Sequence, residues 1–189
     1  ATIFPGGIGM GSTWDSELVE ATARVTSEES GTVGVFWNYN PYLSLARDAR
    51  WGRTCETFGE DPYLVALMGY HQVLGYQGTD LSDPSTMMAT AKSFLANGIP
   101  ERGLNGNGAD ISERRLREIF LPPFAAAVNA GVGSIMGAHN SISGIPSHSS
   151  KFLYTQILRQ ELDFEGVVVS DYRDIEELYG QMHVAESVA

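Results

Sequence analysis

Apolar residues recur every three or four positions in several parts of the chain, the spacing that places them on one face of an α-helix. The clearest case is the helix expected after Asp61, where Pro62 suits the first helical position and Gly75 ends the pattern. An earlier helix is expected to open at Ser12, with Asp15 as its capping partner. Three further helices are expected to begin near Asp110, at Ser149 or Ser150, and at Asp174.

Short apolar runs, bounded by glycine or by polar loops, alternate with these helices and predict β-strands. They cover residues 31–37, 87–94, 132–138 and 167–169. The last run, three consecutive valines, shows no alternation of apolar and polar residues, which predicts a strand buried on both faces. A chain that alternates strand and helix builds a parallel sheet, so the predicted fold class is α/β, with about four parallel β/α units.

Charge and cysteine content narrow the possible classes of protein. The 189 residues carry 12 Lys and Arg against 23 Asp and Glu, a net charge of −11. Such an acidic chain does not suit a nucleic-acid partner, which needs a basic surface. No apolar stretch is long enough to predict a membrane span, so no membrane partner is expected. Cys55 is the single cysteine, which excludes an internal disulfide, and we expect it to be a packed thiol.

The sequence contains no pattern typical of a metal or cofactor site. The four histidines lack the spacing of metal ligands, and no phosphate-binding glycine loop follows a predicted strand. We therefore expect no metal and no cofactor.

A carboxylate follows the last predicted strand. Asp171 stands two residues after Val169, between Ser170 and Tyr172. The carboxyl ends of parallel strands carry the reactive groups of α/β enzymes, so Asp171 is a candidate nucleophile or general base. The alternative is a structural role, because an aspartate in this position often caps the next helix.

Three arginines, Arg47, Arg50 and Arg53, occur within seven residues, beside Trp51 and Gly52. Guanidinium groups bind carboxylates or sugar hydroxyls in fixed geometry. A binding role is indicated most strongly for Arg53. The alternative is a network of ion pairs with the nearby acidic residues, which are Asp48, Glu56, Glu60 and Asp61.

The two central strands also end in polar residues. Lys92 lies within an apolar run, where an ammonium group must reach a cleft or a partner, or extend along the surface to solvent. His139 and Asn140 follow the next strand, with loop capping as the alternative. Together with Asp171, these groups are expected to share one rim of the sheet.

Other features are assigned to structure. The pairs Met87-Met88 and Phe36-Trp37 are expected in the core. The acidic cluster at 174–177 is expected to be a solvated helix start, favoured by the helix dipole.

Several long motifs occur in a fixed order along the chain. They are RDARWGR at 47–53, ETFGEDP at 56–62, ISER at 111–114, LREI at 116–119, LPPF at 121–124, AGVGSIM at 130–136 and GVVVSDY at 166–172. In this order they resemble the family 3 glycoside hydrolases, specifically the β-glucosidase-like members, over essentially the whole chain. The region of similarity is the central part of that family's N-terminal barrel domain.

The resemblance implies a partial (β/α)8 TIM-like barrel that hydrolyses terminal β-D-glycosidic bonds with retention of configuration. It implies that Asp171 is the nucleophile and that Tyr172 flanks the sugar. Arg53 and Lys92 would bind sugar hydroxyls, and His139 stands where many members have a Tyr or Met that lines the pocket. The implied partner is a β-linked oligosaccharide or glucoside.

Ser93 departs from the family pattern, which usually has a histidine after the lysine of this strand. We assign Ser93 to the sugar-binding set and expect one weakened hydroxyl contact, at a cost of about 1–3 kcal/mol. The segment after Phe94 lacks the histidine-containing loop of the N-acetylglucosaminidase branch, which disfavours an amino sugar. β-Xylosidase-type specificity stays an alternative.

The chain is shorter than a full barrel of about 250 residues. We expect residues 1–189 to be a single fragment of such a catalytic domain, with the remaining strands and the acid/base supplied by the rest of the parent protein. Alone, it is expected to be inactive or weakly active; a catalytically incomplete sugar-binding or structural piece is the alternative function. Relatives in this family are often secreted or periplasmic, but the sequence leaves the compartment open.

Overall fold

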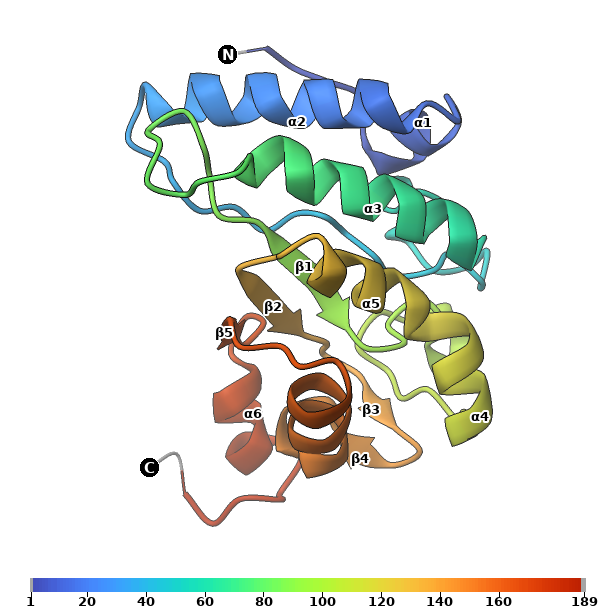
Figure 1. Ribbon diagram of the computed structural model, residues 1–189. Helices are drawn as coiled ribbons and strands as arrows, with labels where there is room; N and C mark the ends of the chain where they lie inside the picture. Colours follow the sequence, from blue (N-terminus) through green and yellow to red (C-terminus); the bar gives the residue numbers. More distant parts are fainter. Residues whose placement is uncertain (1, 188–189) are drawn as a thin grey trace.

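A small parallel sheet lies at the centre of the computed structural model, which describes residues 2–187 (Figure 1). The sheet pairs β1 (Thr90–Phe94), β2 (Ser134–Gly137) and β5 (Val167–Val169), all parallel, in the order β1-β2-β5. A separate antiparallel pair, β3 (Ser141–Ile142) and β4 (Ile145–Pro146), follows β2. Parallel neighbours joined by helices confirm the α/β class and the β/α units of a partial barrel.

The sheet is extended beside β1 by a segment that does not form a regular strand. Met88 N donates to Phe36 O and Thr90 N donates to Asn40 O, both at 2.9 Å. The strand predicted over 31–37 is wrong in position, because the preceding helix continues through residue 31 and the pairing begins only at Phe36.

Three helices form a row, and the last of them packs against β1 (Figure 1). α2 (Ser16–Gly31) and α3 (Pro62–Gln77) lie side by side, and α5 (Pro122–Asn129) packs against α3 (Figure 1). No helix within residues 2–187 has both the length and the apolar composition needed to cross a membrane. The shorter helical segments are α1 (Gly7–Gly11), η1 (Thr54–Glu56), η2 (Glu101–Gly103), α4 (Glu113–Arg115), the π-helical η3 (Leu116–Phe120), η4 (Ser147–Ser149), the π-helical η5 (Phe152–Glu161) and α6 (Asp174–Gly180).

Aspartate caps set where the two long helices begin. The Asp61 side chain accepts from Leu64 N at 2.8 Å, as predicted for α3. In α2 the cap is Asp15, which accepts from Leu18 N at 2.9 Å. The predicted opening at Ser12 is therefore wrong: Ser12 instead ends the short helix α1, because the carboxylate at position 15 accepts from one of the free amides in the first turn of α2.

The hydrophobic core surrounds β1 and β2. Phe94 is fully buried and meets the ring of Phe124 edge to face, with 5.1 Å between centroids. Ile135 and Met87 are also buried, as expected for Met87. The expectation for Phe36 is wrong, because its ring is 52% exposed.

The valine run of β5 is far less buried than its sequence predicts. Val167 and Val168 are 51% and 38% exposed. Among the described strands only β2 pairs with β5, so one edge of β5 and part of its surface face solvent. The predicted burial on both faces is therefore wrong for this strand.

Candidate active site

Arg53 and Lys92 reach the same aromatic ring from different parts of the chain. The Arg53 guanidinium carbon lies 4.6 Å from the centre of the Tyr42 ring, and Lys92 Nζ lies 5.3 Å from it. A cation over an aromatic face is attracted by the ring quadrupole. Tyr42 is itself buried, and its hydroxyl accepts a hydrogen bond of 2.9 Å from Asn97 Nδ2. The ring that gathers the two cations was missed in the sequence, where nothing distinguishes Tyr42 from other aromatic residues.

The arginines near η1 have acidic partners. Arg53 binds Glu56 through two hydrogen bonds of 2.7 and 2.9 Å, and Arg50 binds Asp48 in the same two-point manner. The bond to Glu56 raises the pKa of Arg53, while Arg53 lowers the pKa of Glu56. Ion pairing, the alternative in the sequence, therefore holds for Arg50. Arg53 forms an ion pair with Glu56 and also lies over the Tyr42 ring.

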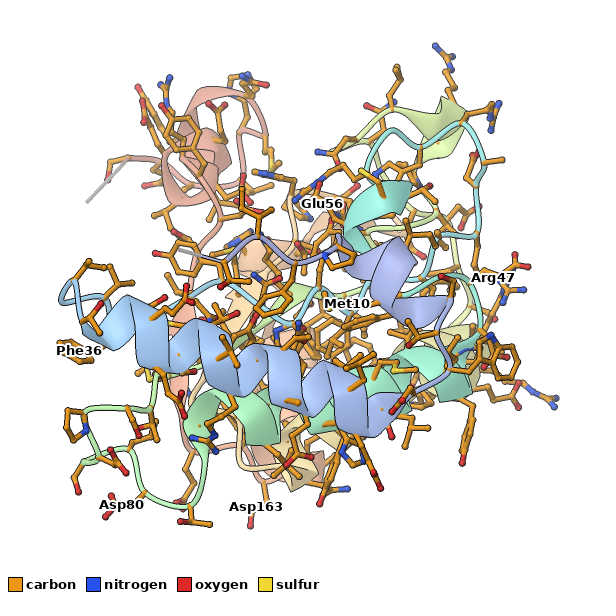
Figure 2. The ribbon with its side chains drawn as sticks, turned by 90° about the horizontal axis from the view of Figure 1, so that it is seen from above. Met10, Phe36, Arg47, Glu56, Asp80 and Asp163 are labelled. Carbon is orange, nitrogen blue, oxygen red and sulfur yellow. The ribbon has the colours of Figure 1, made fainter. Side chains whose placement is uncertain are left out.

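Lys92 lies at the meeting point of opposed charges. Burial lowers the pKa of its ammonium group, and the nearby charge of Arg53 lowers it further. Glu56 and Asp171 act in the opposite direction. Lys92 and Glu56 also line a hollow of about 470 Å³, beside the residues of the N-terminal segment 2–7. Figure 2 shows Glu56 next to α1, whereas Phe36, where the sheet pairing begins, lies at the far end of α2.

Asp171 follows β5, and both of its carboxyl oxygens face protein nitrogen atoms. Oδ1 accepts from Tyr172 N at 2.7 Å, and Oδ2 lies 3.2 Å from His139 Nε2. The backbone N–H of Asp171 points to His148 Nε2, at 3.3 Å. The side chain keeps 17% of its surface exposed, so a ligand can still reach the carboxyl group.

Asp174 joins the two histidines behind Asp171. Its Oδ1 is hydrogen-bonded to His139 Nδ1 at 2.8 Å, and its Oδ2 lies 3.2 Å from His148 Nδ1, without hydrogen-bond alignment. Asp174 is only 5% exposed, so the expectation of a solvated position is wrong for it. Glu176 of the same helix is exposed, as expected, and pairs with Arg173.

This environment shifts the pKa values of His139 and His148 in opposite directions. The hydrogen bond to Asp174 raises the pKa of His139, with the charge of Asp171 acting in the same direction. Burial opposes that rise, and so does the charge of Arg53. For His148, burial dominates and lowers the pKa.

A glycine at the end of β2 makes room for this arrangement. A Cβ atom at Gly137 would collide with His148 Nε2 and with the hydroxyl of Tyr154. Only a residue without a side chain lets η4 carry His148 this close to the sheet.

The remaining predicted residues lie in contrasting places. Tyr172 is 80% exposed beside Asp171. Ser93 is completely buried, and its Oγ has no hydrogen-bond partner within residues 2–187, so its assigned contact with sugar stays a prediction. Asn140 donates to Leu95 O at 3.3 Å, which is the loop-capping alternative. Cys55 is exposed, so the prediction of a packed thiol is wrong. Across residues 2–187, no cluster of His, Cys, Asp and Glu has the arrangement of a metal site.

The parallel β/α units, with a carboxylate at a strand end, define the class as an α/β domain of the barrel type, and comparison with known proteins gives the family. The family model described as "Glycosyl hydrolase family 3 N terminal domain" matches residues 1–189. The chain belongs to this family.

Curated relatives and solved structures agree with this family. A β-xylosidase of Formosa agariphila is 46% identical over 98% of this chain and 26% of its own length. A periplasmic β-glucosidase of Salmonella typhimurium is 38% identical over 94% of this chain and 23% of its own. A β-glucosidase from Listeria innocua, solved as a D270A mutant with laminaribiose, superposes with a TM-score of 0.95 at 36% identity, covering 98% of this chain and 26% of that one. The chain thus spans about a quarter of the length of these proteins, and the superposition confirms the TIM-barrel-like fold.

Proposed function

We propose that this domain takes part in hydrolysing terminal β-D-glucosidic bonds by a retaining double displacement, with Asp171 as the nucleophile. The observation that carries the proposal is the place of Asp171: a partly exposed carboxyl group after a parallel strand, within the electrostatic reach of Arg53 and Lys92. The printed names of the relatives support it, since they are β-glucosidases and β-xylosidases.

In the first step, one oxygen of Asp171 attacks the anomeric carbon and forms an ester bond to it. The bond from that carbon to the aglycone oxygen breaks, and the departing oxygen takes the electron pair and a proton from the acid/base. In the second step the acid/base removes a proton from water, whose oxygen attacks the same carbon. The ester bond then breaks and Asp171 regains its charge. We assign the acid/base to a part of the protein outside this chain.

The other residues of the rim serve the sugar. Arg53 and Lys92 donate to its hydroxyls, and the Tyr42 ring holds these two cations in place. Tyr172 is exposed beside the nucleophile and flanks the sugar ring. His139 completes the pocket wall behind Asp171.

A β-xyloside is the second candidate substrate. The Formosa agariphila relative, at 46% identity, carries the name β-xylosidase. A glucoside is favoured because solved β-glucosidase structures with TM-scores near 0.95 are described as complexes with glucose, laminaribiose and isofagomine.

The test is covalent labelling with a 2-deoxy-2-fluoro-β-glucoside that carries an activated leaving group. This leaving group needs no protonation, so the experiment does not depend on the acid/base. We expect intact-mass spectrometry to show one added 2-fluoroglucosyl group, and peptide mapping to place it on Asp171. Asp171→Asn should abolish the labelling, whereas the control Asp110→Asn, at an exposed carboxylate, should label normally.

Labelling at another carboxylate would reject Asp171 as the nucleophile. The absence of labelling by either sugar in the complete, folded parent protein would reject it as well. The parallel reaction with the 2-fluoro-β-xyloside decides between the substrates. Faster labelling by the xyloside would favour the second candidate.

A further inference from the structure

We propose that Asp174 is a positioning residue that acts through His139 and His148 to hold Asp171 in place. This inference rests on the proposed role of Asp171 as nucleophile. Asp174 is buried in the first turn of α6 and contacts both rings, one through each carboxyl oxygen. Its own backbone N–H donates to Asp171 O at 3.3 Å, which closes a ring of contacts around the candidate nucleophile.

The contact on the His148 side restrains the backbone of Asp171. The N–H of Asp171 donates to His148 Nε2, so that nitrogen must carry a lone pair. The proton of the neutral ring is then on Nδ1, which faces Asp174 Oδ2 at 3.2 Å. Burial, which lowers the pKa of His148, favours this neutral form. The carboxylate charge of Asp174 beside Nδ1, without an aligned hydrogen bond, favours the tautomer that leaves Nε2 free to accept from the nucleophile's own amide.

The contact on the His139 side restrains the carboxyl group. This ring stands between two carboxyl groups, with Nδ1 at 2.8 Å from Asp174 and Nε2 at 3.2 Å from Asp171. A ring that carries a proton on both nitrogens can donate to both carboxyl groups. The hydrogen bond to Asp174 and the charge of Asp171 together raise the pKa of His139. The other charged group that faces His139 is Arg53, which opposes protonation, and His148 reaches the same carboxyl group of Asp174 from η4.

The need for such support follows from the strand. β5 has three residues, two of which are 51% and 38% exposed, so packing holds Asp171 less firmly than it holds the buried end of β1. A nucleophile must stay within a fraction of an ångström of its productive position, because a displacement of about 1 Å can cost about 100-fold in rate. Asp174 supplies this restraint without touching the sugar.

The first readout is the labelling reaction as a function of pH, carried out on the complete expressed protein. We expect Asp174→Asn to slow the labelling of Asp171 by about 10-fold to 100-fold. The change of rate that accompanies deprotonation of His139 should move to lower pH, because the ring loses its carboxylate partner. Asp174→Glu, which returns the carboxylate, should move the profile back towards the original. The matched control Glu176→Gln, an exposed carboxylate of the same helix, should change neither quantity.

The second readout is the state of the histidine rings, followed by NMR with selective ¹⁵N labelling of histidine. We expect His148 with its proton on Nδ1, and a titration midpoint of His139 above the ordinary value of 6.5, in the unsubstituted protein. Asp174→Asn should lower the midpoint of the His139 titration. The proton of the His148 ring should then no longer be confined to Nδ1. These spectra do not depend on covalent modification of Asp171 by the fluoroglucoside, so they test the inference even if the proposed nucleophile is wrong.

The outcomes separate the two proposals. If Asp171 is not labelled but the rings behave as expected, the proposed function fails and Asp174 still positions the histidines. If Asp171 in the Asp174→Asn variant is labelled at the original rate and with the original pH profile, the inference is overturned. If Asp174→Asn does not fold, a His148 ring protonated on Nε2 in the unsubstituted protein overturns it equally.

Discussion

Lys92 and Asp171 reach the same rim from strands with very different support. Lys92 belongs to β1, which is paired with β2 on one side and with the segment around Tyr42 on the other. Asp171 follows β5, which has a strand partner only on its β2 side within the described chain. The neighbours of Lys92 in β1 are completely buried, whereas Val167 and Val168 before Asp171 are 51% and 38% exposed.

The difference shows that two kinds of force can hold one site. On the β1 side, apolar packing fixes the backbone, and the cations are gathered on an aromatic ring. On the β5 side, polar contacts from α6 and η4 replace the missing packing. Substitutions of packed core residues should therefore act mainly on stability, and substitutions of the polar groups on the rim mainly on sugar binding or on the chemistry of Asp171.

The largest expected effect comes from Ile135 and Val168, which face each other as register partners in β2 and β5. Ile135→Ala should lower the free energy of unfolding by about 2–5 kcal/mol, because it opens a cavity in the core. Val168→Ala, at a residue that is 38% exposed, should cost less than about 1 kcal/mol. Urea unfolding of both variants measures the contrast. Equal costs would mean that the open face of β5 is covered in solution.

A smaller effect, confined to the sugar, is expected for Lys92→Met. Removal of the ammonium group should weaken binding of the 2-fluoroglucoside by about 1–3 kcal/mol, through the loss of a charged hydrogen bond to a hydroxyl. Stability should be kept, because burial already disfavours the charged form of Lys92. The concentration dependence of labelling and a urea titration measure the two quantities. The control Lys151→Met, at an exposed lysine, should leave both unchanged, and a loss of stability without a loss of binding in Lys92→Met would contradict the division.

The smallest effect is a dependence of stability on pH that belongs to the β5 side. The raised pKa of His139 stabilises the fold below the ordinary value of 6.5, and this contribution is lost as pH rises through the raised value. The lowered pKa of His148 acts in reverse, so its contribution is present above 6.5 and is lost as pH falls towards the lowered value.

We therefore expect His139→Gln to reduce the loss of stability as pH rises (the alkaline decline). His148→Gln should reduce the loss of stability as pH falls (the acidic decline). Urea midpoints between about pH 5 and pH 9 provide the measurement. The exposed His183→Gln should retain both declines. A retained alkaline decline in His139→Gln would show that another group causes it.

The sequence predicted the elements whose cause is local. The α3 cap at Asp61 needs only its immediate neighbours, and the apolar runs of β1 and β2 are buried as their composition suggests. The valine run of β5 was misinterpreted because the same run suits a central strand or an edge strand. Which one it becomes depends on what lies next to it in space.

The candidate site was predicted in part for the same reason. Placing Asp171 and Lys92 on one rim required only the parallel order of the strands. Asp174 was assigned to solvent because its partners lie far away in sequence: His139 is 35 residues distant. The spacing of Asp171 and Asp174, three residues apart, was the available signal that both carboxyl groups face His139.

The exposed thiol of Cys55 gives this rim a property that a packed thiol would not have. Cys55 lies in η1 between Arg53 and Glu56, and the sequence has no other cysteine. A maleimide fluorophore would therefore attach at one position, beside the cation held over the Tyr42 ring. Its emission would report sugar arriving at the rim in real time, with no substitution needed to introduce the attachment point.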